Sequence, residues 1–211
     1  MAATAQAPTE QKNELDQDAL AEKCQPADII VTRDTGLASG GIAMGSCSSY
    51  SHAILSVGDG MCVESMPVEG VTPKPLKEAL RKCTYAVLFR HRTIGSQEAL
   101  WVSKIAKEFA RAQIPFDQLG AARSGAQTGC AYEPGRMLFV VSIMIEVVDN
   151  LLKNSQADHD ASFFCSELVA RAFEQGYVPL LDVPAHAINP GSLVRSQYLQ
   201  QIEVLVNREQ S

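Results

Sequence analysis

The sequence predicts an α+β domain, because β-like runs and helical stretches are unevenly distributed along the chain. Most short runs rich in β-branched residues precede residue 91, and three stretches with helical features follow it. A length of 211 residues with 46% apolar residues is sufficient for one hydrophobic core. We therefore expect a single domain over residues 14–211. Residues 1–13 have few apolar side chains and no periodicity, which predicts a disordered N-terminus.

The first half of the chain predicts a short helix, four strands and a brief helical segment. The turn sequence Gly58-Asp59-Gly60 lies between two of the β-like runs and is a strong signal for a β-hairpin. Residues 34–50 are rich in glycine and serine, which predicts a long loop. In chain order we expect a helix at 15–23, strands at 27–32, 51–57 and 61–65, a helical turn or two at 77–82, and a strand at 85–90.

The second half predicts three helices and a final strand. The clearest helix covers residues 97–113, with an apolar face opposite a basic one. On its apolar face we expect Leu100, Ile105, Ala106 and Phe109, opposite Lys104, Lys107 and Arg111. Residues 118–137 have the composition of a loop. Further helices are expected at 137–153 and 162–175, the latter ending at Gly176, and a strand at 202–206.

The charge pattern excludes one class of partner and indicates a cellular location. The net charge is −6 and the lysines and arginines are scattered, so we expect no binding to nucleic acid. The first residues lack the basic and apolar segments of a secretory signal, and no apolar run reaches the length that spans a bilayer. We therefore expect a protein that is cytoplasmic as synthesised, with secretion by a signal-independent route left open.

Cys165 is the cysteine with a chemically distinct position. The six cysteines contain no Cys-x-x-Cys pair, and their wide spacing predicts reduced, inert thiols rather than a disulfide framework or a zinc site. Cys165, however, lies at the start of the predicted helix 162–175, with Asp160 or Ser162 available as the cap. The partial positive charge of a helix N-terminus stabilises a thiolate. The alternative is a buried structural cysteine behind two phenylalanines.

A thiolate nucleophile requires a general base, and His52 is the best placed of the four histidines. It begins an apolar strand just before the hairpin turn, where the strand would hold it rigidly. We expect His91 to be solvated beside its two arginines, His186 to lie in a proline-bounded loop, and His159 to be the rival partner in an acidic loop. The alternative for His52 is a core histidine with a structural hydrogen bond.

Glu64 is the third candidate, because a hairpin centred on Asp59 pairs residue 54 with residue 64. That register puts Glu64 diagonal to His52 on the same face of the sheet. A carboxylate there accepts the imidazole N–H and stabilises the imidazolium. A different register would turn Glu64 to the other face of the sheet. Cys62 is two residues away and shares the face of Glu64, so it could also point inward. Tyr50 is a further candidate, as a contact for the substrate carbonyl or oxyanion, with simple packing as its alternative.

These residues carry a resemblance to a known enzyme family. The motifs are Ser51-His52-Ala53-Ile54-Leu55, the Gly58-Asp59-Gly60 turn with Val63-Glu64, Phe164-Cys165-Ser166-Glu167-Leu168, and Asn189-Pro190-Gly191-Ser192-Leu193. Together they resemble the circularly permuted, NlpC-type papain-like cysteine hydrolases, which are related to the lecithin retinol acyltransferase-like enzymes. The resemblance covers about residues 26–90 and 160–200, and it is weak at about 118–160, where we expect an insert.

The resemblance implies an antiparallel sheet packed on the nucleophile helix. It implies Cys165 as nucleophile, His52 as base and Glu64 as orienting residue. The His strand precedes the Cys helix, which is the permuted order, and a glutamate as third member is nearer the bacterial branch. The chemistry would proceed through a thioacyl-enzyme, without a metal or organic cofactor.

The substrate class depends on residues 137–145, a nine-residue apolar stretch without charge inside the insert. As a helix this stretch is apolar on every side, so it is either wholly buried in the core or exposed as an interfacial helix. The exposed form would contact a membrane surface and favours acyl esters of membrane phospholipids as substrates. The alternatives are an amidase acting on peptidoglycan-type peptides and a non-catalytic ligand-binding module. A metal site formed by His159, Asp160 and Cys165 is a further alternative, although its spacing fits no standard ligand pattern.

Overall fold

The described part of the chain is an α+β fold with one antiparallel sheet, which confirms the predicted class. The computed structural model describes residues 16–34, 49–117, 120–121 and 162–208. Six strands pair in the order β4-β3-β2-β1-β5-β6, and every pairing is antiparallel. The strands are β1 (Ile29–Asp34), β2 (His52–Gly58), β3 (Met61–Met66), β4 (Gly70–Pro75), β5 (Cys83–His91) and β6 (Leu199–Asn207).

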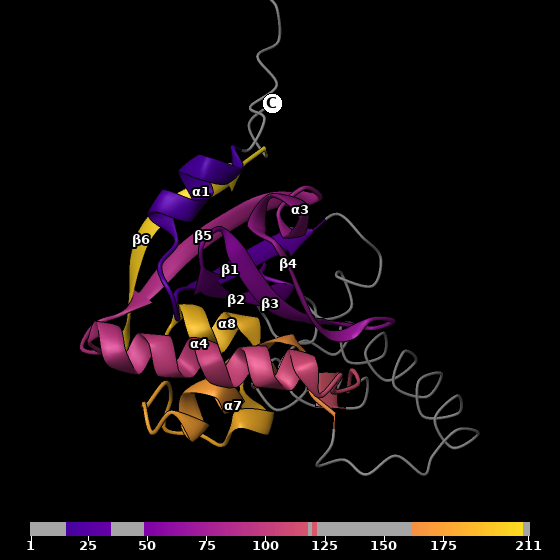
Figure 1. The fold of residues 1–211 in the computed structure, drawn as a ribbon, viewed down its shortest axis with the longest axis vertical. Helices are drawn as coiled ribbons and strands as arrows, with labels where there is room; N and C mark the ends of the chain where they lie inside the picture. The colour runs from indigo at the N-terminus through magenta and orange to yellow at the C-terminus, as the bar shows by residue number, and fades with distance from the viewer. Residues whose placement is uncertain (1–15, 35–48, 118–119, 122–161, 209–211) are drawn as a thin grey trace, which may run out of the picture.

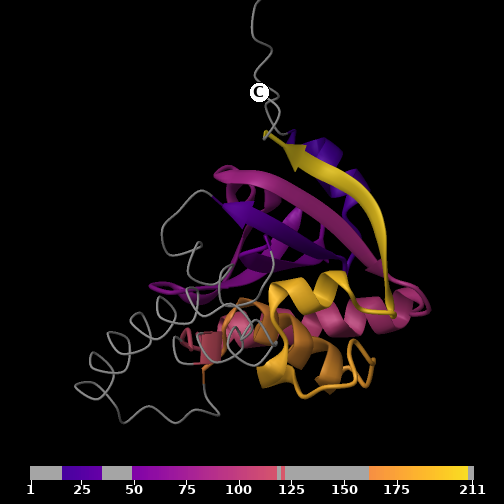
Figure 2. The ribbon, with the colours of Figure 1, turned by 180° about the vertical axis from the view of Figure 1, so that it is seen from behind.

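Helices cover both faces of this sheet. In chain order they are α1 (Gln17–Lys23), α3 (Leu76–Ala79), α4 (Ser96–Arg111), α7 (Cys165–Gln175), the 3₁₀ turn η2 (Ala185–Ala187) and α8 (Pro190–Val194). Figures 1 and 2 show α4, α7 and α8 gathered on one side of the sheet, with α1 and α3 on the other. The chain therefore forms three layers, and the sheet is the middle one.

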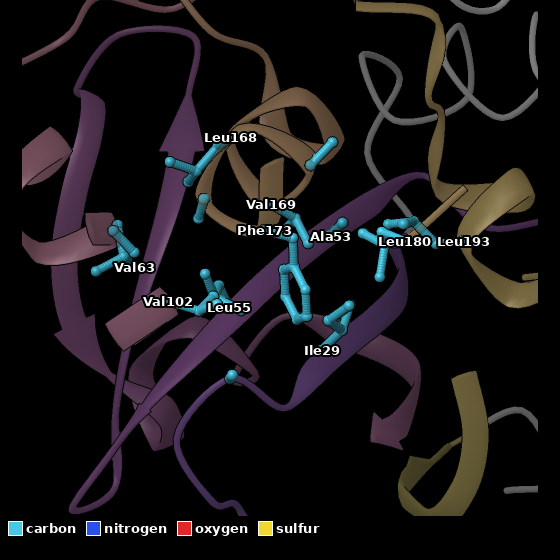
Figure 3. Close-up of a cluster of buried hydrophobic side chains, with 14 of the residues drawn as sticks. Ile29, Ala53, Leu55, Val63, Val102, Leu168, Val169, Phe173, Leu180 and Leu193 are labelled. Carbon is cyan, nitrogen blue, oxygen red and sulfur yellow. The ribbon is translucent and has the colours of Figure 1, made fainter. Parts of the chain in front are cut away.

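Two hydrophobic cores follow from this layering. The larger core joins the sheet to α4 and α7, and Figure 3 shows side chains of β1, β2 and β3 meeting those of the two helices. Its most deeply buried large side chains include Phe173, Leu168 and Leu55. The smaller core lies between the sheet and α1 and α3, and it contains Ile30, Ile54 and Leu88. Alternate residues of β1 and β2 thus face different helices, as the two-residue period of a strand requires.

The hairpin between β2 and β3 forms as the sequence predicts. Gly58, Asp59 and Gly60 all have positive φ values, of 83°, 55° and 69°. Glycine and aspartate tolerate this left-handed conformation better than β-branched residues do. The turn sets the register that pairs Leu55 with Val63, and this pair is centred on Asp59, as expected. The expected register is therefore confirmed.

Two predicted environments are wrong. Leu100 was expected on the buried face of α4, but its side chain is 59% exposed, and Val102 lies in the core with Ile105, Ala106 and Phe109 instead. His91 was expected to be solvated, but it is buried, and its ring stacks between Phe173 and Tyr198. Its Nε2 lies 2.8 Å from the carbonyl oxygen of Pro179. The last residue of β5 therefore turns inward to a structural partner.

Several predictions concern residues outside the described part of the chain. These are the N-terminus at 1–13, nearly all of the 34–50 loop, the 137–153 helix and most of the 118–160 insert. Among the described residues, no helix is both long and apolar enough to cross a membrane.

Phe173 tests the larger core. Its side chain is fully buried between α7 and the sheet, so Phe173→Ala should lower the free energy of unfolding by about 3–5 kcal/mol. Tyr177→Ala removes a side chain that is 94% exposed and is the matched control, with an expected change within about 0.5 kcal/mol. Urea denaturation followed by circular dichroism measures both. Equal stability of the two variants would contradict this packing.

Candidate active site

Cys165 is the first residue of α7, and the helix start is built differently from the prediction. The cap is Phe164, in extended conformation and without a side-chain cap bond, rather than Ser162, which is buried upstream; Asp160 lies outside the described residues. Glu167, at the third helical position, accepts a hydrogen bond from the backbone N–H of Phe164. This is half of a capping box, and it fixes the turn that presents Cys165.

The start of α7 fits against a place where β2 and β3 separate. Among the described residues, the pairing of these strands runs only to Leu55 and Val63, although β2 begins at His52 and β3 continues to Met66. The N–H of Ala53 donates to the sulfur of Cys165 instead. The hydroxyl of Ser65 donates to the carbonyl oxygen of Phe163, at 2.6 Å. Both strands therefore hold the N-terminus of the helix.

His52 and Glu64 meet across this separation. The Nε2 atom of His52 lies 2.8 Å from Oε2 of Glu64, and the side chains are 13% and 4% exposed. The diagonal placement follows from the hairpin register. His52 also forms a hydrogen bond with Cys165. Since Nε2 faces the carboxylate, Nδ1 is the ring nitrogen left for the thiol. The three predicted residues thus form one chain of contacts.

The electrostatics favour a thiolate–imidazolium pair. Burial alone would raise the pKa of Cys165, but the His52 imidazolium and hydrogen bonds from His52 and from the N–H groups of Ala53 and Ser166 lower it below the usual value. Burial opposes the charge on His52 as well, yet the Cys165 thiolate and the Glu64 carboxylate raise its pKa well above the usual value. The pKa of Glu64 is lowered in turn, because His52 and Lys74 outweigh its burial.

The other described cysteines have the opposite chemistry. Cys24, Cys62 and Cys83 are free and buried in the smaller core. Burial raises the pKa of the Cys24 thiol to about 12, and it raises the pKa values of Cys62 and Cys83 further. These thiols stay protonated and unreactive at neutral pH. Cys47 and Cys130 lie outside the described residues.

Lys74 is a site residue that sequence reasoning missed. Its ammonium lies 2.7 Å from Oε1 of Glu64 and 3.1 Å from Oε2 of Glu69. In β4 it pairs with Cys62, so it lies diagonal to Glu64 on the neighbouring strand. No strand was predicted at residues 70–75, where Pro73 and Pro75 disfavour one, and without that strand the lysine has no place beside Glu64.

Of the other candidates, the structure describes Tyr50 and His186. The Tyr50 ring lies 6.4 Å from that of Tyr85, with the Arg33 guanidinium over both rings, and these contacts fit the packing alternative. His186 is exposed on η2. His159 falls outside the described residues, as does Asp160. Within the described ranges, no three histidine, cysteine or carboxylate side chains are grouped closely enough to hold a metal ion.

Comparisons with known proteins identify no family for this chain. No protein-family model matches the sequence, and no curated protein matches it. One similar solved structure is that of the metalloprotein yiiX from Escherichia coli O157:H7, described as DUF1105. It is 17% identical, the similarity covers 86% of this chain and 97% of that one, and the TM-score is 0.48. A similarity of that size carries no conclusion about the chemistry of this chain.

Thiol reactivity tests this description of the site. With its pKa lowered, Cys165 should be alkylated by iodoacetamide faster than any other cysteine at about pH 6, where an ordinary thiol with a pKa near 8.5 is almost fully protonated. Peptide mass spectrometry measures the rate at each cysteine. His52→Ala is the matched variant and should slow labelling of Cys165, because it removes the cation that stabilises the thiolate. Faster labelling at Cys47 or Cys130 would overturn the assignment.

Proposed function

We propose that the protein is a cysteine hydrolase or acyltransferase with Cys165 as nucleophile, His52 as general base and Glu64 as orienting residue. One observation carries the proposal: a buried thiol at a helix N-terminus contacts an imidazole whose other nitrogen is 2.8 Å from a buried carboxylate. The pKa values of the three groups are shifted in the directions that nucleophilic catalysis by a thiol requires, lowered for Cys165 and Glu64 and raised for His52. A structural cysteine has no need of a partner that lowers its pKa.

We further propose that the fold is a circularly permuted papain-like fold of the NlpC type. Two features support this. The strand that carries His52 precedes the helix that carries Cys165, in the order of the enzymes that the sequence resembles. The antiparallel sheet also packs directly on that helix. A third member that is a glutamate fits the bacterial branch of these enzymes.

Acylation begins with the thiolate of Cys165. Its sulfur forms a bond to the carbonyl carbon of the substrate, and the carbonyl oxygen becomes an oxyanion. Backbone N–H groups at the first turn of α7 are suited to bind that oxyanion, because a helix N-terminus presents unpaired donors. When the carbonyl re-forms, the bond to the leaving group breaks. The His52 imidazolium gives its proton to the leaving alkoxide or amine, and a thioester remains on Cys165.

Deacylation returns the enzyme to its starting state. Neutral His52 takes a proton from water or from an acceptor alcohol, whose oxygen attacks the thioester carbon. The thiolate leaves, and the acid or the new ester is released. Glu64 keeps Nε2 protonated throughout, so Nδ1 remains the nitrogen that exchanges protons. The cycle uses only the thiol, the imidazole, the carboxylate and backbone donors. Tyr50, which packs beside Arg33 and Tyr85, remains the candidate contact for the substrate carbonyl.

The proposed substrates are acyl esters of membrane phospholipids. Support comes from the uncharged apolar stretch at residues 137–145, which as an exposed helix would contact a membrane surface. A thioester intermediate serves amides equally well, so cleavage of peptidoglycan-type peptides is the alternative outcome. Both proposals use the same three residues, and only the substrate differs.

Incubation with two substrates separates these activities. Mixed phospholipid liposomes should bind the protein and release fatty acid and lysolipid, measured by mass spectrometry of the lipid extract. Cys165→Ala should abolish release, and His52→Ala should lower its rate by about 10²–10⁴. His186→Ala, which removes an exposed histidine from η2, is the matched control and should behave as the wild type.

Two results would contradict the proposal. Cleavage of purified cell-wall peptides that depends on Cys165, with no acyl chain released from liposomes, would replace the lipid substrate by a peptide amide. Equal rates for His52→Ala and His186→Ala would remove His52 from the mechanism.

A further inference from the structure

The chain of charged contacts does not end at the carboxylate of Glu64. We propose that Lys74 is a positioning residue, which holds the Glu64 carboxylate against His52 and acts through it on the contact between His52 and Cys165. The inference rests on the proposed role of Cys165, and it assigns a function to β4, a strand that provides no member of the catalytic group.

The geometry gives each oxygen of Glu64 its own cation. Oε2 lies 2.8 Å from Nε2 of His52, and Oε1 lies 2.7 Å from Nζ of Lys74. A carboxylate bound at both oxygens cannot rotate without breaking one of the two contacts. The contact between Oε1 and Lys74 therefore fixes the orientation in which Oε2 faces His52.

Lys74 is itself held in place. Its side chain is only 16% exposed, and its ammonium also reaches Glu69, whose side chain is 56% exposed, in the turn between β3 and β4. Its backbone pairs with that of Cys62, and the Cys62 thiol donates to the Lys74 carbonyl oxygen at 3.3 Å. Lys74 thus connects the buried carboxylate of Glu64 to the exposed carboxylate of Glu69, and the pairing of β4 with β3 holds its backbone in place.

The direction in which the Lys74 charge shifts the pKa values of His52 and Cys165 can be predicted. The Glu64 carboxylate stabilises the His52 imidazolium, and the neighbouring ammonium offsets part of that negative charge. The other titratable groups that act on Glu64 or Lys74 are the exposed Glu69 and the protonated thiols of Cys62 and Cys83. Removing the ammonium makes the surroundings of His52 and Cys165 more negative, which raises the pKa values of both groups. The thiolate and the neutral imidazole should therefore both form at higher pH.

The test is the pH profile of Cys165 alkylation by iodoacetamide, read by peptide mass spectrometry. Lys74→Met keeps the length of the side chain and removes its charge, and it should move both limbs of the profile to higher pH, by about one pH unit. Lys74→Arg keeps the charge and should restore the wild-type profile. Lys23→Met removes an exposed lysine that pairs with Glu203, and it is the matched control with an unchanged profile.

The outcomes separate this inference from the proposed function. Thermal unfolding first establishes that each variant is folded, and Lys74→Gln, which also removes the charge, replaces Lys74→Met if Lys74→Met is unfolded. A wild-type profile for Lys74→Met, or a shift to lower pH, would overturn the role of Lys74 while leaving the nucleophile in place. A Cys165 that shows no enhanced reactivity in the wild type would overturn the proposed function itself.

Discussion

The buried contact between Cys165 and His52, where the pKa shifts favour a thiolate–imidazolium pair, is the constraint on which the rest of the site depends. Removing two charges from water costs several kcal/mol for each ion, so the pair persists only where hydrogen bonds and further charges offset that cost. Cys165 is 3% exposed, and its sulfur accepts hydrogen bonds from the N–H groups of Ala53 and Ser166. The imidazolium is matched by Glu64, and Glu64 by Lys74.

The fold brings these groups together by interrupting its own sheet. The pairing of β2 and β3 near the hairpin turn ends at Leu55 and Val63. Beyond that point Ala53 of β2 donates to the sulfur of Cys165, and Ser65 of β3 donates to Phe163, just before α7 begins. The two hydrophobic cores keep the strands and the helix rigid on either side of that opening. A single interruption therefore positions Cys165, His52 and Glu64, the three residues of the proposed mechanism.

The sequence predicted what depends on local chemistry. The glycine-flanked turn determines the hairpin register, so the meeting of His52 and Glu64 was predictable from that turn alone. The position of Cys165 at a helix start was predictable from the sequence around it, but its cap was not, because Phe164 caps through its extended backbone and Glu167 closes the turn. The sequence does not predict β4, because its two prolines are tolerated only on an edge strand. Which strand lies at the edge depends on the order of all six strands in the sheet. Lys74 was missed with β4, and His91 was misjudged because its partners, Phe173 and Tyr198, are distant in sequence.

The protonation of His52 tests the central claim most directly. NMR of protein with ¹³C-labelled histidine, with the His52 signal identified by its loss in His52→Ala, follows the ring as the pH changes. The ion pair predicts an imidazolium at neutral pH in the wild type, and a midpoint at clearly lower pH in Cys165→Ala, where the thiolate that stabilises the cation is absent. A His52 that is neutral at neutral pH in the wild type, or that has the same midpoint in both proteins, would contradict the account.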